Sequence, residues 1–253
     1  MEEYENIYDK IKELLGSIPA RMNVLEDTID IELQLEYFEL SRRLRNRDEP
    51  HLIMNSAERL FEDSTSLDEK KNLLAQIASL DKIEAYRAIE RFQNEKPGDL
   101  KSWSTLALHE NRMLLESKLL DENHVFISTG LGGRGEKLRY FIVLFARESE
   151  YFSELQRKII KNEFEMSLKK HSSEMEEIKF SGSMATILAM IPMKINIRNI
   201  FNEAIEESNQ YGNFLVSNFI ISNVKTMSFE EIKHYVKTQN KARALYPNNS
   251  YDI

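Results

Sequence analysis

The sequence predicts an α+β protein with an all-helical N-terminal half packed against a C-terminal domain that mixes strands and helices. Apolar residues recur at helical spacing through residues 29–114, and there are only 8 Gly and 5 Pro in 253 residues. From residue 124 onward the pattern changes to short runs rich in β-branched and aromatic side chains. We therefore expect two domains, residues 1–122 and residues 123–253.

The composition is that of a globular protein with a sizeable core, because 42% of the residues are hydrophobic and 30% are charged. The absence of Cys excludes a disulfide framework, Cys-ligated zinc and a thiol nucleophile. The acidic N-terminus lacks the apolar run of a signal peptide, and the longest apolar stretch, residues 185–193, is too short to span a bilayer. We expect a cytoplasmic protein with no membrane partner.

The two halves differ in charge. The net charge of −8 disfavours non-specific binding of nucleic acid by the whole chain. Residues 1–122 carry 17 Lys+Arg against 27 Asp+Glu, whereas residues 123–253 carry 17 against 15. We interpret the acidic excess of the first half as solvated helix faces.

The helical half has recognisable start signals and one family resemblance. Ser66 to Glu69 and Asp81 to Glu84 have the spacing of capping boxes. Leu74-Ala75, Ala85, Asp99-Leu100 and Ala107-Leu108 make residues 73–115 similar to a HEAT-type helical repeat. Any antiparallel helical bundle would place packing residues in the same way, so that alternative stays open. In both cases neighbouring helical hairpins bury their faces against each other.

The second half predicts strands at 124–129, 138–145, 178–190 and 214–221, separated by a glycine-rich turn or by helices. The resulting order is β-β-α-β-α-β-α, with Gly182 as a bulge or bend in the third strand. This order is compatible with a variant of the ferredoxin-like arrangement, although order alone does not determine topology.

The motif-like feature is the glycine cluster at residues 130–135. Gly130, Gly132 and Gly135 match G-x-G-x-x-G, but the loop leads into a strand, and a dinucleotide-binding loop must lead into a helix. One interpretation is a hairpin turn that needs positive φ. The other is a site for an anion or a partner, where exposed amides are joined by basic side chains. The candidate site residues are Gly130, Gly132, Gly133, Arg134, Gly135, Lys137 and Arg139.

No catalytic constellation can be recognised. The five His residues lack metal-ligand spacing, and Gly-x-Ser-x-Gly is absent, so we expect no metal and no cofactor and assign no catalytic residue. Lys and Arg residues between 157 and 170 give one helix a positive character, which intervening Glu residues dilute.

The leading interpretation is a non-enzymatic adaptor that binds another protein through its helical scaffold. The alternative is an α/β domain that binds a phosphate-bearing small molecule or nucleic acid through the glycine-rich hairpin 130–135. Of these ligands, nucleic acid is disfavoured by the overall negative charge. A third reading is a structural subunit of an oligomer.

Overall fold

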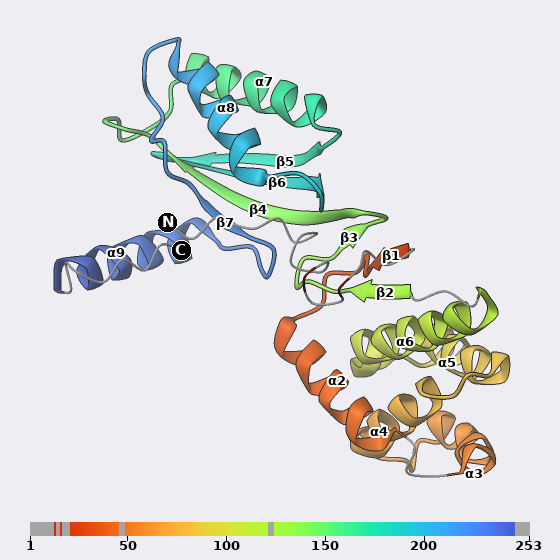
Figure 1. Cartoon of the computed structure of the whole chain (residues 1–253). Helices are drawn as coiled ribbons and strands as arrows, with labels where there is room; N and C mark the ends of the chain where they lie inside the picture. Colours follow the sequence, from red (N-terminus) through yellow and green to blue (C-terminus); the bar gives the residue numbers. More distant parts are fainter. Residues whose placement is uncertain (1–12, 14–15, 17–20, 46–48, 121–123, 246–253) are drawn as a thin grey trace. The chain divides into compact units, whose positions relative to one another are not determined.

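The computed structural model describes residues 13, 16, 21–45, 49–120 and 124–245. The chain divides into two compact units (Figure 1). One, here called the helical unit, is Pro19–Gly130; the other, the sheet unit, is Leu131–Ile253 together with Met1–Ile18. The mixture of helix and sheet confirms the α+β class. The expectation that the two halves pack against each other stays a prediction.

The helical unit contains five α-helices among its described residues, together with one pair of strands. The helices are α2 (Ile31–Leu44), α3 (Pro50–Asn55), α4 (Leu67–Ala78), α5 (Ile83–Glu95) and α6 (Lys101–Leu120), with short 3₁₀ turns at Ala57–Phe61 and Gly98–Leu100. Strand β1 (Arg21–Val24) pairs in parallel with β2 (His124–Ile127). The first half is therefore not all-helical, and the strand predicted at residue 124 pairs with β1 and not with the strand at 138. A four-residue strand whose partner lies a hundred residues away leaves almost no local signal.

Packing in the helical unit follows the predicted apolar stripes. Trp103 on α6 is 1% exposed, and its ring meets that of Tyr37 edge-on at a centroid distance of 5.2 Å. The capping box from Ser66 to Glu69 is confirmed at the start of α4. The second predicted box is wrong, because α5 starts after Lys82 without a side-chain cap and Asp81 pairs with Lys118. The resemblance of residues 73–115 to a HEAT-type repeat stays a prediction.

The sheet unit is built on an antiparallel sheet. Its elements are β3 (Gly133–Arg134), β4 (Lys137–Phe145), α7 (Glu154–Lys170), β5 (Glu174–Ser181), β6 (Met184–Pro192), α8 (Ile197–Asn209), β7 (Ile220–Ser222) and α9 (Phe229–Leu245). The strand order is β3-β4-β6-β5, and β7 also pairs with β4. From β4 to β7 the order of elements is β-α-β-β-α-β with β6 inserted between β4 and β5, the ferredoxin-like split arrangement.

Two of the predicted strands differ from those observed. The run 178–190 is not one strand but parts of β5 and β6, which turn at Gly182 with a φ of +56°. A Cβ at Gly182 would come within 3.3 Å of the Glu150 carbonyl oxygen, so the close approach of another backbone also requires glycine there. The strand predicted at 214–221 is reduced to β7, at Ile220–Ser222, preceded by an isolated bridge between Leu215 and Ala146.

Both faces of the sheet are covered. Phe141 and Val143 of β4 pack with Ile232 of α9 on one face. Side chains alternate along a strand, so the buried Leu138 and Ile142 of β4 point to the other face. Helices α7 and α8 lie on that face (Figure 1). This topology brings the β3–β4 turn, the α7–β5 connection and the β6–α8 connection to one end of the sheet, where Lys137 is paired with Pro192 in the register.

Candidate anion-binding pocket

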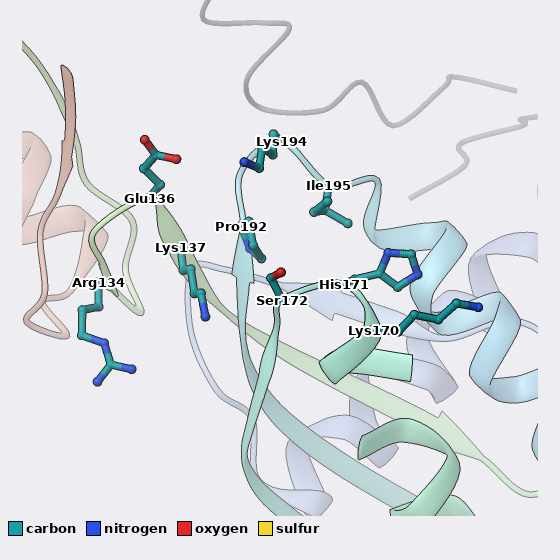
Figure 2. A pocket seen from close by; sticks show the side chains of 9 residues that line it. All are labelled: Arg134, Glu136, Lys137, Lys170, His171, Ser172, Pro192, Lys194 and Ile195. Carbon is teal, nitrogen blue, oxygen red and sulfur yellow. The ribbon is translucent and has the colours of Figure 1, made fainter. Parts of the chain in front are cut away.

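The three connections at this end of the sheet line an open cavity of about 410 Å³ in the sheet unit (Figure 2). Its basic side chains come from all three segments: Arg134, Lys137, Lys170, His171 and Lys194. Pro192 and Ile195 contribute apolar surface, and Ser172 and Glu136 complete the lining. We call this cavity the basic pocket. Ligand pockets are usually lined mainly by apolar and aromatic side chains. The lining of this one is rich in basic side chains, which favours a ligand with negative charge.

The β3–β4 turn sets the first wall. Gly135 has a φ of +60° at the first central position of a two-residue turn, which is what a type II′ hairpin requires. The turn places Arg134 directly opposite Lys137, a pair of like charges that would destabilise the hairpin alone. Glu174 of β5 bridges them, with its oxygens 3.0 Å from Arg134 Nη2 and 2.6 Å from Lys137 Nζ. The hydrogen bond from Lys137, then its charge and that of Arg134, lower the pKa of Glu174.

The end of α7 sets the opposite wall. Ser173 N donates to Leu168 O at 2.8 Å and Ser172 N donates to Lys169 O at 3.1 Å, which is the Schellman arrangement. Ser172 occupies its left-handed position with a φ of 55°, where glycine is usual. Just before it, Lys170 and His171 share the carboxylate of Glu203, and His171 Nε2 lies 3.4 Å from Glu203 Oε2.

The carboxylate of Glu203 is held in its charged form. The hydrogen bond from Lys170, followed by the contact with His171, lowers the pKa of Glu203. In return, the hydrogen bond with Glu203 raises the pKa of Lys170. The second wall therefore repeats the arrangement of the first, with one ionised carboxylate between two basic groups.

The β6–α8 connection carries the remaining cation. Lys194 is exposed and has no ion-pair partner among the described residues. Three residues later α8 begins, with no side-chain cap from Asn196 and no acidic residue in the first turn. Its N-terminal amides and the positive end of its dipole therefore receive no anion from the cap residue or from the first turn. Met193 N donates to Glu136 O at 3.0 Å, which ties this segment to the β3–β4 turn.

The pocket contains part of the candidate site predicted from the sequence. Arg134 and Lys137 line it, whereas Arg139 binds Glu176 through two nitrogens, at 2.6 and 3.1 Å, and donates to Leu131 O at 2.7 Å.

The glycines of the cluster do not line the pocket. Gly132 and Gly133 are buried, and Gly132 O accepts from Arg139 N at 2.9 Å. Gly130 is the last residue of the helical unit, and Gly135 forms the turn. The exposed amides expected along residues 130–135 are therefore not provided by Gly132 and Gly133.

The sequence does not reveal that Lys170, His171, Ser172 and Lys194 line the same pocket as Arg134. In the sequence, Lys170 belongs to a helix whose basic residues alternate with Glu, and His171 has no metal-ligand spacing. In an antiparallel sheet the start of one strand lies beside the end of its neighbour, so strand positions could have indicated that these residues meet. That inference depends on recognising residues 174–192 as two strands.

Other kinds of site are not evident in the part of the chain that the structure describes. Within it, no group of three or more His, Asp or Glu residues could hold a metal ion, and no helix is long and apolar enough to cross a membrane.

No protein-family model matches this chain, and no curated protein matches it. Among solved structures, it is similar to a Deinococcus radiodurans protein assigned as a transposase, with 12% identity and a TM-score of 0.36 over 41% of this chain and 91% of the other. It is also similar to a REP-associated tyrosine transposase bound to a REP hairpin, with 10% identity and a TM-score of 0.31 over 43% of this chain and 68% of the other. Such scores assign this chain neither a family nor an activity.

Two expectations from the sequence are not upheld. The similar structures are transposases rather than helical-repeat adaptors, and one of them is bound to a REP hairpin, against the expectation that nucleic acid is disfavoured. The physical reason lies in the charge distribution: residues 1–122 hold the acidic excess, and a whole-chain sum hides the basic pocket.

Proposed function

We propose that this protein binds a phosphate-bearing ligand in the basic pocket of its sheet unit. The observation that carries the proposal is the convergence of five basic side chains from three connections on one open cavity. Oxyanions are the ligands that such a set recognises, because Arg and Lys donate charge-assisted hydrogen bonds to phosphate.

The local balance of charge supports an anionic ligand. One carboxylate, that of Glu174, serves both Arg134 and Lys137, so these three side chains together carry one excess positive charge. Lys194 adds a second positive charge that no described side chain neutralises. Glu136 also lines the cavity, and Figure 2 shows its carboxylate at the rim, directed away from Lys137.

The start of α8 favours the same ligand class. A helix N-terminus offers unpaired amides and a partial positive charge, and phosphate groups bind there when the surroundings permit. Here the surroundings are Lys194 and Ile195 on the rim of the pocket, and neither the cap residue nor the first turn supplies a competing anion.

The test is a binding panel on the full-length protein by isothermal titration calorimetry. The probes are inorganic phosphate, nucleoside mono-, di- and triphosphates, and short single-stranded DNA and RNA. We expect at least one probe to bind, and we expect the double variant Arg134→Ala/Lys194→Ala to bind it at least about tenfold more weakly, since a hydrogen bond to a charged group contributes roughly 1.5–3 kcal/mol.

The matched control is Lys225→Ala/Lys233→Ala, which removes two exposed cations of the same unit outside the pocket. This variant is expected to bind like the unmodified protein. Equal losses in both double variants would indicate only a general effect of charge. The proposal is overturned by that result, and also if no probe binds.

A further inference from the structure

We infer that the sheet unit contains a second binding site, and that its ligand is an α-amino acid with an apolar or aromatic side chain. The site is a cavity of about 370 Å³, which lies within the range of roughly 300–1,000 Å³ that is usual for ligand pockets. It shares no lining residue with the basic pocket, so the inference does not rest on the proposed function. We call this cavity the sheet-face pocket.

The floor of the sheet-face pocket is formed by three neighbouring strands. Phe141 of β4 is paired with Leu188 of β6, and Leu188 is paired with Glu177 of β5. In the next row, Thr186 of β6 is paired with Lys179 of β5. Directly paired residues on one face have Cβ atoms roughly 4.5–5.5 Å apart, so these five residues make one continuous surface.

The cover that α9 gives to this face of the sheet stops at the pocket. Phe141 packs in one core cluster with Ile232 of α9, whereas Leu188 is the one residue of β6 that is not fully buried. Met227 and Phe229, just before and at the start of α9, are half-buried and line the same pocket. Much of the accessible lining is therefore apolar, which favours a ligand with an apolar or aromatic body.

One buried hydroxyl in the pocket lacks a partner. Thr186 is 7% exposed, and its Oγ1 has no hydrogen-bond partner among the residues that the structure describes. Buried polar side chains are nearly always hydrogen-bonded, so a ligand that reaches Thr186 supplies a partner that the protein does not. Ser228 also lines the pocket but is already used at the start of α9, where Glu231 N donates to Ser228 Oγ at 3.2 Å.

Two side chains of opposite charge complete the polar lining. Lys179 Nζ lies 2.7 Å from Glu177 Oε2, and the two side chains are 60% and 51% exposed. No other described residue that lines this pocket is charged, so its charges balance, in contrast to those of the basic pocket. This balance disfavours a phosphate and fits a zwitterion, whose ammonium and carboxylate groups are attached to one carbon atom.

The register indicates how an amino acid binds. Its carboxylate accepts from Lys179 and from the hydroxyl of Thr186, which are paired across β5 and β6. Its ammonium donates to Glu177, one row away, and its side chain lies over Leu188. The ion pair between Lys179 and Glu177 is exposed and therefore weak, so a ligand that contacts both groups separates them at little cost.

The experiment is isothermal titration calorimetry on the full chain with L-phenylalanine, L-leucine and L-methionine. We expect at least one of them to bind. The N-acetyl amide of the one that binds best keeps the side chain but loses both charges, and it should bind at least about tenfold more weakly. Adenosine and cytidine, which present a planar ring without opposite charges, should also bind more weakly.

The inference is overturned if none of the three amino acids binds. It is also overturned if the N-acetyl amide or a nucleoside binds as tightly as the best amino acid, because the opposite charges would then have no part in recognition.

A pair of double variants tests the charged contacts. Glu177→Gln/Lys179→Met should weaken binding of the amino acid at least about tenfold, because both charged partners are removed. The matched control is Glu165→Gln/Lys169→Met, which alters a charged pair on α7 outside both pockets and should bind like the unmodified protein. Equal affinities of the two double variants would contradict the inference.

Thr186→Val tests the buried hydroxyl. Valine keeps the shape of the side chain, so binding should weaken severalfold while the melting temperature does not fall, because the hydroxyl loses no partner within the described chain. An unchanged affinity would overturn the assignment of Thr186 to the site. Binding of phosphate-bearing probes in the basic pocket should be the same in all these variants, so each proposal can fail without the other.

Discussion

Charged groups are used differently in the two units of this protein. In the helical unit, Glu110 is 6% exposed and accepts hydrogen bonds from Tyr37 at 2.6 Å, from Ser41 at 2.7 and 2.9 Å and from Arg45 at 2.9 Å. In the sheet unit, Glu174 is exposed and Glu203 is half-buried, and each is shared by two basic groups.

The difference separates a structural charge from one that can exchange partners. Burial, then the charge of Glu110, raises the pKa of the Tyr37 hydroxyl well above its ordinary value, so Tyr37 stays a donor to the carboxylate. A buried carboxylate with four donor contacts has no capacity for a ligand. Cations that share one exposed carboxylate retain that capacity, which is why the basic pocket and not Glu110 is the candidate site.

The largest expected effect is the loss of the buried carboxylate. Glu110→Ala should lower the free energy of unfolding by about 3 kcal/mol, because it leaves the hydroxyls of Tyr37 and Ser41 buried without their acceptor. Urea unfolding followed by circular dichroism measures the change. Glu90→Ala, which breaks the more exposed pair with Arg87, should cost less than about 1 kcal/mol. Equal costs in the two variants would remove the distinction between a buried carboxylate and a more exposed one.

A second pair of variants compares, inside the sheet unit, a basic side chain that stabilises the fold with one that is available to a ligand. Arg139 is 20% exposed and ties β4 to Glu176 and to Leu131 O, so Arg139→Ala should cost about 1–2 kcal/mol of unfolding free energy. Arg134 is 62% exposed, so Arg134→Ala should cost less than about 0.5 kcal/mol while weakening phosphate binding. Thermal unfolding and calorimetry on both variants measure the two effects. If Arg134→Ala lowered the unfolding free energy more than Arg139→Ala, the assignment of a structural role to Arg139 would be contradicted.

A smaller effect is expected at Ser172, where the backbone is left-handed at the edge of the pocket. Ser172→Gly should raise the unfolding free energy by about 0.5–1 kcal/mol, because glycine adopts positive φ without a Cβ clash. Asn213, with a φ of 51°, provides a comparison outside the pocket. Asn213→Gly should gain less, because Asn tolerates this conformation. A loss of stability in Ser172→Gly would show that the serine side chain stabilises the turn.

The smallest effect concerns pH and the helical unit. Burial, only partly opposed by Asp27, lowers the pKa of His109, so folding favours its neutral form. The unfolded chain then binds more protons, and the stability from His109, complete above pH of about 6.5, should decline as the pH falls towards its folded pKa. Melting temperatures at pH 7.5 and 5.5 should differ more in the unmodified protein than in His109→Gln. An equal difference would assign the pH dependence to other groups.

Local features of the sequence predicted local structure well. The box from Ser66 to Glu69 forms as expected. Ser228 and Glu231 have the same spacing before α9, and there Glu231 N donates to Ser228 Oγ at 3.2 Å. At the start of α7 the box is formed by Ser153 with Gln156 and not by the nearby Ser149. Ser149 instead binds Tyr151 in a turn, which a Ser near a helix start can equally do.

Helix stripes, capping boxes, the turn glycines and the mixed α+β class follow from residues a few positions apart, because backbone geometry and burial periodicity act over one or two turns or strands. Neighbouring residues do not predict the long-range arrangement. This includes the pairing of β1 with β2, the insertion of β6 between β4 and β5, and the shared pocket lined by Arg134, Lys170 and Lys194. They depend on which distant segments share a sheet edge or an end of the sheet. The pairing of distant segments is decided by the packing energy of the whole fold, and no single stretch of sequence is enough to predict it.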